Sequence, residues 1–183
     1  MTERRDDDGF SLAYFWRGLP GHPIHPPLTD IVIGAYTFAV VAATADVLGV
    51  STNAATHGWW LALAFALLAT IPTAITGFAD WLRLDSGTPL WRTATAHMIS
   101  MLLASAVFLA AVVAGKGSFD AGNVETGPYV LTLAGYVLLV VGGWLGGRLV
   151  FVHGMRVLNL VDEPARQAAA PVPTPEKREA EGS

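Results

Sequence analysis

The segment from Gly21 to Leu48 reads GHPIHPPLTDIVIGAYTFAVVAATADVL and decides the fold. Its run from Leu28 to Leu48 has about the 20 apolar residues that a membrane-spanning helix needs. Pro27 suits the first turn of such a helix, and Gly49 suits its end. Because the prolines before Leu28 disfavour helix, we expect His22 and His25 on an extended segment that leads to the membrane.

Three further apolar runs of similar length follow, so the chain is predicted to cross the membrane four times. The predicted spans are residues 28–48, 58–81, 90–114 and 129–152. The composition agrees, because 52% of the residues are hydrophobic, 14% are charged and the mean hydropathy is +0.46. Soluble domains carry about a quarter charged residues. We therefore predict an all-α integral membrane four-helix bundle over residues 20–156, with the lipid bilayer as its main partner.

The chain has no cysteine, which excludes disulfides, thiolate metal sites and cysteine-held iron–sulfur clusters within it. No basic cluster with interleaved aromatic residues indicates nucleic-acid binding. Any metal must therefore be bound by histidine, carboxylate or backbone oxygen.

The positive charges predict the orientation, because cytoplasmic segments of membrane proteins are enriched in Lys and Arg. Ten positive residues fall on the side of the termini and only Lys116 on the other. Both termini are therefore predicted to be cytoplasmic. Trp59 and Trp60 are expected in the outer aromatic belt and Trp81 in the inner one. Residues 1–19 are expected to form a cytoplasmic N-terminal and interfacial segment, polar over 1–9 and aromatic-rich over 10–19, and residues 157–183 are predicted to be a disordered tail.

Small residues predict how the helices pack, since they let backbones approach within a membrane. Gly135, Gly142 and Gly146 return to one side of the fourth span. That glycine-rich face serves helix packing or an oligomer contact. In the first span, Asp30, Thr37 and Thr44 share a face, which we expect in the bundle core.

Ionisable residues concentrate at the cytoplasmic ends of the spans, and such groups inside membranes usually face the interior and have partners. Asp30 begins the first span, and Asp80 ends the second with Arg83 or Arg92 as a possible ion-pair partner. His97 begins the third span and His153 ends the fourth. Asp46, near the outer end of the first span, is expected to form a buried hydrogen bond.

Two kinds of ligand fit this cluster. His22, His25 and His97 are candidate cofactor ligands, because two histidines can hold a haem iron. His25, Asp80, His97 and His153 are candidate ligands of a divalent metal. The alternative is that these groups only join the helices by hydrogen bonds.

Four motifs resemble an uncharacterised family of bacterial four-span membrane proteins, catalogued as a domain of unknown function. They are HPIHPPLTD before the first span, GFADWLRL ending the second, RTATAHMIS opening the third and GGWLGGRLVFVHG ending the fourth. The resemblance covers about residues 19–156. It implies the bacterial inner membrane, and recurring polar positions at His22, His25, Asp30, Asp80, Arg92 and His97. Some relatives are associated with Rieske-type iron–sulfur proteins, which implies a separate membrane redox partner here.

Three functions remain open at this stage. The first is a redox-associated subunit that holds a metal or haem at the His/Asp cluster. The second is a non-catalytic membrane scaffold, and the third a proton or small-solute carrier, for which the spans show no inverted repeat. An ordinary enzyme is not expected, because no nucleophile with a base, paired catalytic carboxylates or phosphate-binding loop is evident.

Overall fold

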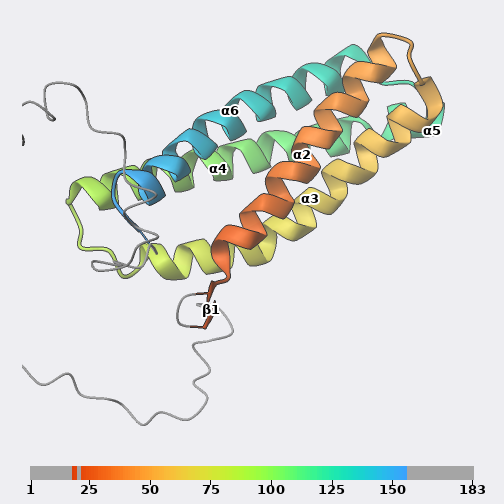
Figure 1. Ribbon diagram of the computed structural model, residues 1–183. Helices are drawn as coiled ribbons and strands as arrows, with labels where there is room; N and C mark the ends of the chain where they lie inside the picture. Colours follow the sequence, from red (N-terminus) through yellow and green to blue (C-terminus); the bar gives the residue numbers. More distant parts are fainter. Residues whose placement is uncertain (1–17, 20–21, 156–183) are drawn as a thin grey trace, which may run out of the picture.

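The computed structural model describes residues 18–19 and 22–155, and four long helices dominate this part of the chain (Figure 1). They are α2 (His25–Val47), α3 (Thr52–Trp81), α4 (Pro89–Ala114) and α6 (Thr126–Phe151). Each is long and apolar enough to cross a membrane. The predicted all-α fold with four membrane spans is confirmed. The predicted disordered tails lie outside the described residues, apart from Gly18 and Leu19.

The first helix begins earlier than expected. α2 starts at His25, so the prediction that His25 lies on an extended segment is wrong. Pro26 and Pro27 lie in the first turn, where backbone N–H groups have no intrahelical partner and proline is tolerated. His22 does precede the helix, in strand β2 (His22–Pro23), which pairs antiparallel with β1 (Gly18–Leu19). α3 also begins six residues before the predicted position 58.

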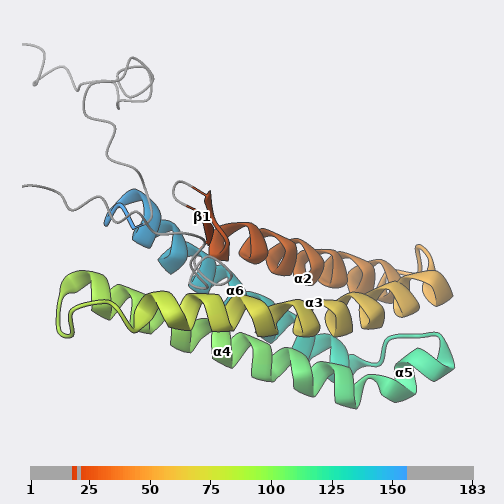
Figure 2. The same ribbon diagram turned by 90° about the horizontal axis from the view of Figure 1, so that it is seen from below.

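The four helices form two hairpins that lie side by side. α2 packs along α3, and α4 packs along α6, while α3 also contacts α4 and α2 contacts α6 (Figures 1 and 2). Tyr36 of α2 and Phe108 of α4 stack at the centre, with ring centroids 3.9 Å apart and planes 11° from parallel. Both rings are fully buried. This stack joins the two hairpins in the middle of the bundle.

The two ends of the bundle differ in what they bury. We call the end with Arg83, Arg92 and Arg148 the arginine end and the opposite one the Lys116 end. The apolar core occupies the centre and the half nearer the Lys116 end. Its buried residues are Val32, Tyr36, Ala39, Ala42, Ala43, Trp59, Leu63, Ala66, Ala104, Phe108, Ala111, Val124 and Leu139. Toward the arginine end the buried positions include polar side chains, namely Thr73, Thr76, Asp80 and Ser100. Polar side chains are also buried at the Lys116 end, namely Asp46, Thr56, Ser118 and Thr132, so the apolar centre lies between two more polar ends.

The Lys116 end is held by hydrogen bonds from buried side chains. Asp46 accepts a bond from Thr56 Oγ1 at 2.7 Å and another from the backbone nitrogen of Val124 at 2.7 Å. Its carboxylate thereby joins the end of α2 to the start of α3 and to the segment before α6. Trp59 donates to Thr132 Oγ1 at 3.0 Å and is fully buried, so its predicted place in the aromatic belt is wrong.

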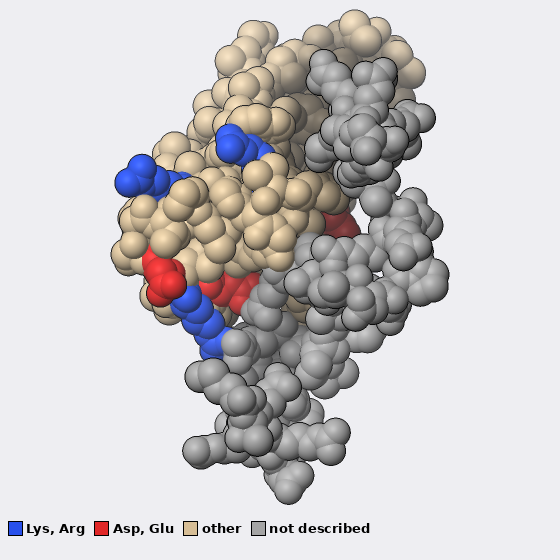
Figure 3. All heavy atoms as spheres, turned by 60° about the vertical axis from the view of Figure 1, so that its left-hand side comes forward, with Lys and Arg blue, Asp and Glu red and all other residues tan. Residues whose placement is uncertain are grey.

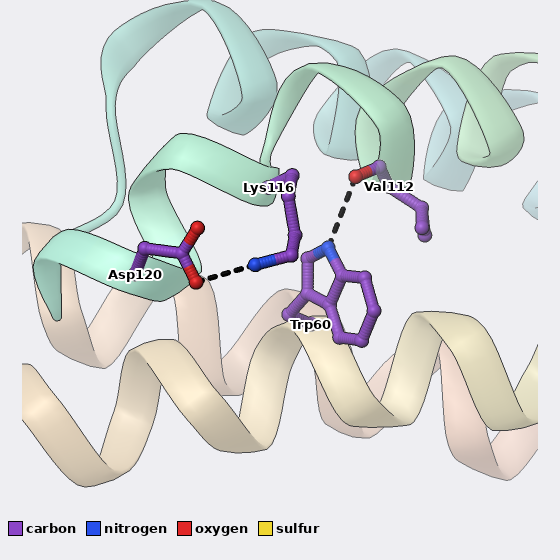
Figure 4. A network of polar contacts seen from close by, with 4 residues as sticks. All are labelled: Trp60, Val112, Lys116 and Asp120. Atoms are coloured by element: carbon purple, nitrogen blue, oxygen red, sulfur yellow. Dashed lines mark hydrogen bonds and ion pairs between the residues drawn. The ribbon is translucent and has the colours of Figure 1, made fainter.

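A short helix that the sequence did not predict, α5 (Lys116–Ala121), follows α4 at this end (Figure 4). Trp60 Nε1 donates to the backbone oxygen of Val112 at 3.0 Å, one of the last carbonyls of α4. Such carbonyls lack a full set of intrahelical partners, so the indole caps the helix end. Lys116 pairs with Asp120 on the exposed side of α5.

The small and polar stripes differ in where they face. Gly135, Gly142 and Gly146 of α6 face α4, where an added Cβ would lie 2.8 Å from Phe108, 2.5 Å from Met101 and 3.2 Å from His97 respectively. These glycines serve packing within the bundle. The face of α2 with Asp30, Thr37 and Thr44 was expected in the bundle core. This prediction is wrong for Asp30, because Asp30 is exposed. Thr37 Oγ1 donates to Ile33 of its own helix.

Candidate ligand site at the arginine end

The arginine end carries the three arginines of the described residues, together with Asp80 and Asp85. Figure 3, which brings this end forward, shows blue and red side chains among the tan residues of the described part. Arg83, Arg92 and Arg148 are exposed there, and Arg148 lies over the ring of Trp144 at 5.2 Å from its centroid. The histidines beneath this charged rim are half-buried, so they belong to the polar part of the bundle interior.

His25 is held against α3 by hydrogen bonding and by packing. Its Nδ1 lies 3.0 Å from the backbone oxygen of Thr73 and 3.1 Å from Thr76 Oγ1. The imidazole lies against Gly77, where an added Cβ would come within 2.6 Å of His25 Cε1. A side chain at position 77 would therefore displace the ring.

His97 is held against α6 in the same way. Its Nδ1 lies 2.8 Å from the backbone oxygen of Gly142, and its ring lies against Gly146. In each hairpin, then, a histidine of the first helix contacts a backbone carbonyl on the second helix. It also contacts a glycine that lies four residues after that carbonyl. Because a carbonyl oxygen only accepts, Nδ1 carries the ring hydrogen in both histidines. In the neutral ring, Nε2 then has the lone pair, which is the form of imidazole that binds a metal.

The two histidines also occupy equivalent positions in the two hairpins. His25 lies seven residues before the buried Val32, and His97 lies seven residues before the buried Ala104. Seven residues are about two helical turns, so both histidines lie on the core side of their helices. Trp81 Nε1 donates to Thr95 Oγ1 at 2.9 Å, which sets α4 against α3. His97 therefore lies within about one turn of the depth of Gly77, against which His25 packs.

The remaining predicted residues are more scattered. His22 lies in β2, and its side chain is outside the description. His153 follows the end of α6, where its Nε2 lies 3.2 Å from Thr93 Oγ1. Asp80 is buried on α3 and Arg92 is exposed on the first turn of α4. Their ion pair stays a prediction.

Within residues 18–19 and 22–155, no group of three or more His, Cys, Asp or Glu side chains lies close enough to hold a metal ion. A protein site for a bare divalent metal uses at least three ligands. A haem brings four nitrogen ligands of its own and needs only one or two axial side chains. Ligation of a metal or haem by His25 and His97 stays a prediction.

The sequence identified the two histidines but not their partners. Gly77 and Gly146 can be recognised in the sequence as small residues within spans. The backbone carbonyls of Thr73 and Gly142 cannot, because every residue type has a backbone carbonyl. A signal that was available is the shared spacing from each histidine to the buried residues seven positions later.

Comparison with known proteins gives one match. The model of a family described as "Predicted membrane protein (DUF2231)" matches residues 21–159, which include all four long helices and both histidines. No curated protein and no solved structure shows a significant match.

Proposed function

Because the chain belongs to the DUF2231 family of predicted membrane proteins, a description that assigns no activity, we propose a function from its own residues: a redox-associated membrane subunit that holds a haem between His25 and His97. The observation that carries the proposal is the matched setting of the two imidazoles. Each is oriented by a backbone carbonyl on Nδ1 and by a facing glycine. Ligating histidines characteristically donate their second ring nitrogen to such a partner.

Two hydrogen bonds near the histidines support this position for the site. Ser100 donates to the backbone oxygen of Leu138 at 2.9 Å, and Thr76 donates to Pro72 at 3.0 Å. These bonds hold the helix faces on which the histidines pack. A haem bound there would carry one electron, and the protein residues would set its orientation and surroundings. The chain has no cysteine for an iron–sulfur cluster, so its electron partner is a separate membrane redox protein.

The setting of the protein in the cell is part of the same proposal. The positive charges support a cytoplasmic position for both termini and the arginine end, and we propose the bacterial inner membrane as the location. The histidine pair then lies toward the cytoplasmic side of the bilayer.

A visible absorption spectrum with haem extraction tests the proposal on full-length protein purified in mild detergent from haem-supplied cells. We expect a Soret band and stoichiometric haem in the wild type, and loss of both in His25→Ala and in His97→Ala. His57→Ala is the matched control, because His57 bonds Asn53 at the Lys116 end. Folded wild type without haem, or haem retained in both site variants, would contradict the proposal.

A non-catalytic scaffold is the second candidate, and one observation favours it. In the described part of the chain, every buried side-chain nitrogen and oxygen has a hydrogen-bond partner. The histidines could therefore act only by joining helices, as Trp59 does at the other end. In that case His97→Ala lowers stability, while purified wild type shows no visible absorption and no bound metal by elemental analysis.

A further inference from the structure

Arg148 is an exposed cation within a membrane-spanning helix. It lies in the last turn of α6, whose apolar span is Thr126–Phe151. Phe151 is three residues further along, so the backbone of Arg148 lies about 4.5 Å inside the end of the span at 1.5 Å per residue. No acidic side chain in the described part of the chain pairs with Arg148. Its charge is therefore not neutralised by the described bundle.

The side chain of Arg148 leans toward the centre of the bilayer. Its guanidinium carbon lies 5.2 Å from the centroid of the Trp144 ring, and Trp144 is about one helical turn nearer the middle of the span. Long side chains on a helix lean toward its N-terminus, which for α6 is at the Lys116 end. Arg148 therefore leans away from the last carbonyls of α6, which are the usual partners of a basic residue in the last turn.

Arg92 has the opposite setting at the same end of the bundle. It lies three residues after Pro89, the first residue of α4, and is exposed. Because α4 begins at the arginine end, its side chains lean toward the membrane surface, where a guanidinium is hydrated. The guanidinium of Arg148 is held beside the apolar ring of Trp144 instead. Charged groups at such positions normally have a partner, so Arg148 requires an anion from its surroundings.

The surroundings of Arg148 are those of a lipid-facing surface. Trp144 is 64% exposed, and Val141 and Val137 continue the exposed apolar face toward the middle of α6. Beside this face, no other element comes within 4 Å of the position that a Cβ at Gly143 would take, so an acyl chain has room along the helix. A phospholipid whose chains lie on this face has its phosphate near the end of the apolar span, which is the depth of Arg148.

We propose that Arg148 and Trp144 form a binding site for the headgroup of an anionic phospholipid in the leaflet at the arginine end. The planar guanidinium can donate two parallel hydrogen bonds to a phosphate. Indole rings favour the depth of the headgroups. Arg148 is the only charged side chain of α6, so the helix offers a cation for the phosphate and no carboxylate for the amine of a zwitterionic lipid. Charge complementarity therefore selects an anionic lipid.

Native mass spectrometry of the full-length protein in mild detergent tests this site. Phosphatidylglycerol is the anionic probe, and phosphatidylcholine, which has the same phosphate and a cationic amine, is the comparison. We expect the wild type to bind the first phosphatidylglycerol about fivefold more tightly than phosphatidylcholine. Arg148→Gln should lose most of this preference. Arg92→Gln is the matched control, because it removes the same charge from the same end of the bundle, and it should keep the preference.

Two further measurements separate the headgroup contact from a general effect of charge. Arg148→Lys keeps the charge but not the planar pair of donors, so it should keep only part of the preference. Soluble glycerol phosphate should not displace the lipid, because it has no acyl chain to lie on α6. Equal affinity of the wild type for both lipids, equal losses in Arg148→Gln and Arg92→Gln, or displacement by glycerol phosphate would overturn the proposal. This inference does not depend on haem binding.

Discussion

The tight contact between α6 and α4 can be tested by adding one carbon atom. An alanine Cβ at position 135 would lie 2.8, 2.9 and 3.1 Å from three ring atoms of Phe108. Phe108 cannot move away, because its ring is fully buried and stacks on Tyr36 with centroids 3.9 Å apart. Gly135→Ala should therefore force the two hairpins apart where they join.

Two opposing effects determine the magnitude. Overpacking a rigid core by a methyl group costs about 1–3 kcal/mol. Alanine in place of glycine favours a helix by roughly 0.5–1 kcal/mol. Gly143→Ala is the matched control on the same helix, because its Cβ would meet no atom within 4 Å. Gly143→Ala should gain only the stabilisation that alanine gives a helix. The two variants should therefore differ in free energy of unfolding by about 1–3 kcal/mol.

Reversible unfolding in mixed micelles, followed by far-UV circular dichroism, measures this difference. Phe108→Leu in the Gly135→Ala background should recover part of the loss, because a smaller side chain relieves the contact. Equal stability of Gly135→Ala and Gly143→Ala would refute the packing of Phe108 between α6 and Tyr36.

Two further predictions concern the Lys116 end and the orientation. Asp46→Ala should lower the free energy of unfolding by about 1.5–3 kcal/mol, because a buried carboxylate with two hydrogen bonds is lost. Asp120→Ala should change it by at most about 0.5 kcal/mol, since its ion pair with Lys116 on α5 is exposed. The same unfolding assay measures both variants. Gly117→Cys should react with a membrane-impermeant maleimide in intact bacterial cells and Ser86→Cys only after permeabilisation; labelling of both in intact cells would contradict the predicted orientation.

The four spans could be predicted from sequence because length and hydropathy alone decide them. The start of α2 could not, since proline disfavours helix in general but is accepted in its first turn, and only the backbone shows which applies to Pro26 and Pro27. The prediction that Asp30 faces the bundle core was wrong for a related reason. Helical spacing shows that Asp30 and Thr37 share a face, but not whether that face meets the core or the lipid.

The histidine site was predictable in its residues and not in its geometry. His25 and His97 are recognisable as ionisable groups at span ends, but each is oriented by a backbone carbonyl, which any residue type can supply. His153 is as strong a candidate as His25 and His97 from the sequence alone. In the structure it lies after the end of α6 and contacts Thr93.

The equivalence of the histidines is part of a repeat that relates α2 to α4, the first helices of the two hairpins. Buried positions recur 72 residues apart, as in Tyr36 and Phe108, or Ala39 and Ala111. The repeat reaches the Lys116 end, where Asp46 and Ser118 are also 72 apart. Asp46 accepts from the backbone nitrogen of Val124, and Ser118 Oγ accepts from that of Glu125 at 3.0 Å.

Few of these equivalent residues are identical, so the repeat is visible through burial and hydrogen bonding rather than through residue type. Both hairpins begin at the arginine end, so the repeat is parallel rather than inverted. A parallel repeat places equivalent residues at one depth on opposite sides of a shared axis. If a haem binds to this protein, His25 and His97 would hold it from equivalent positions in the two hairpins, and the haem would supply one-electron chemistry.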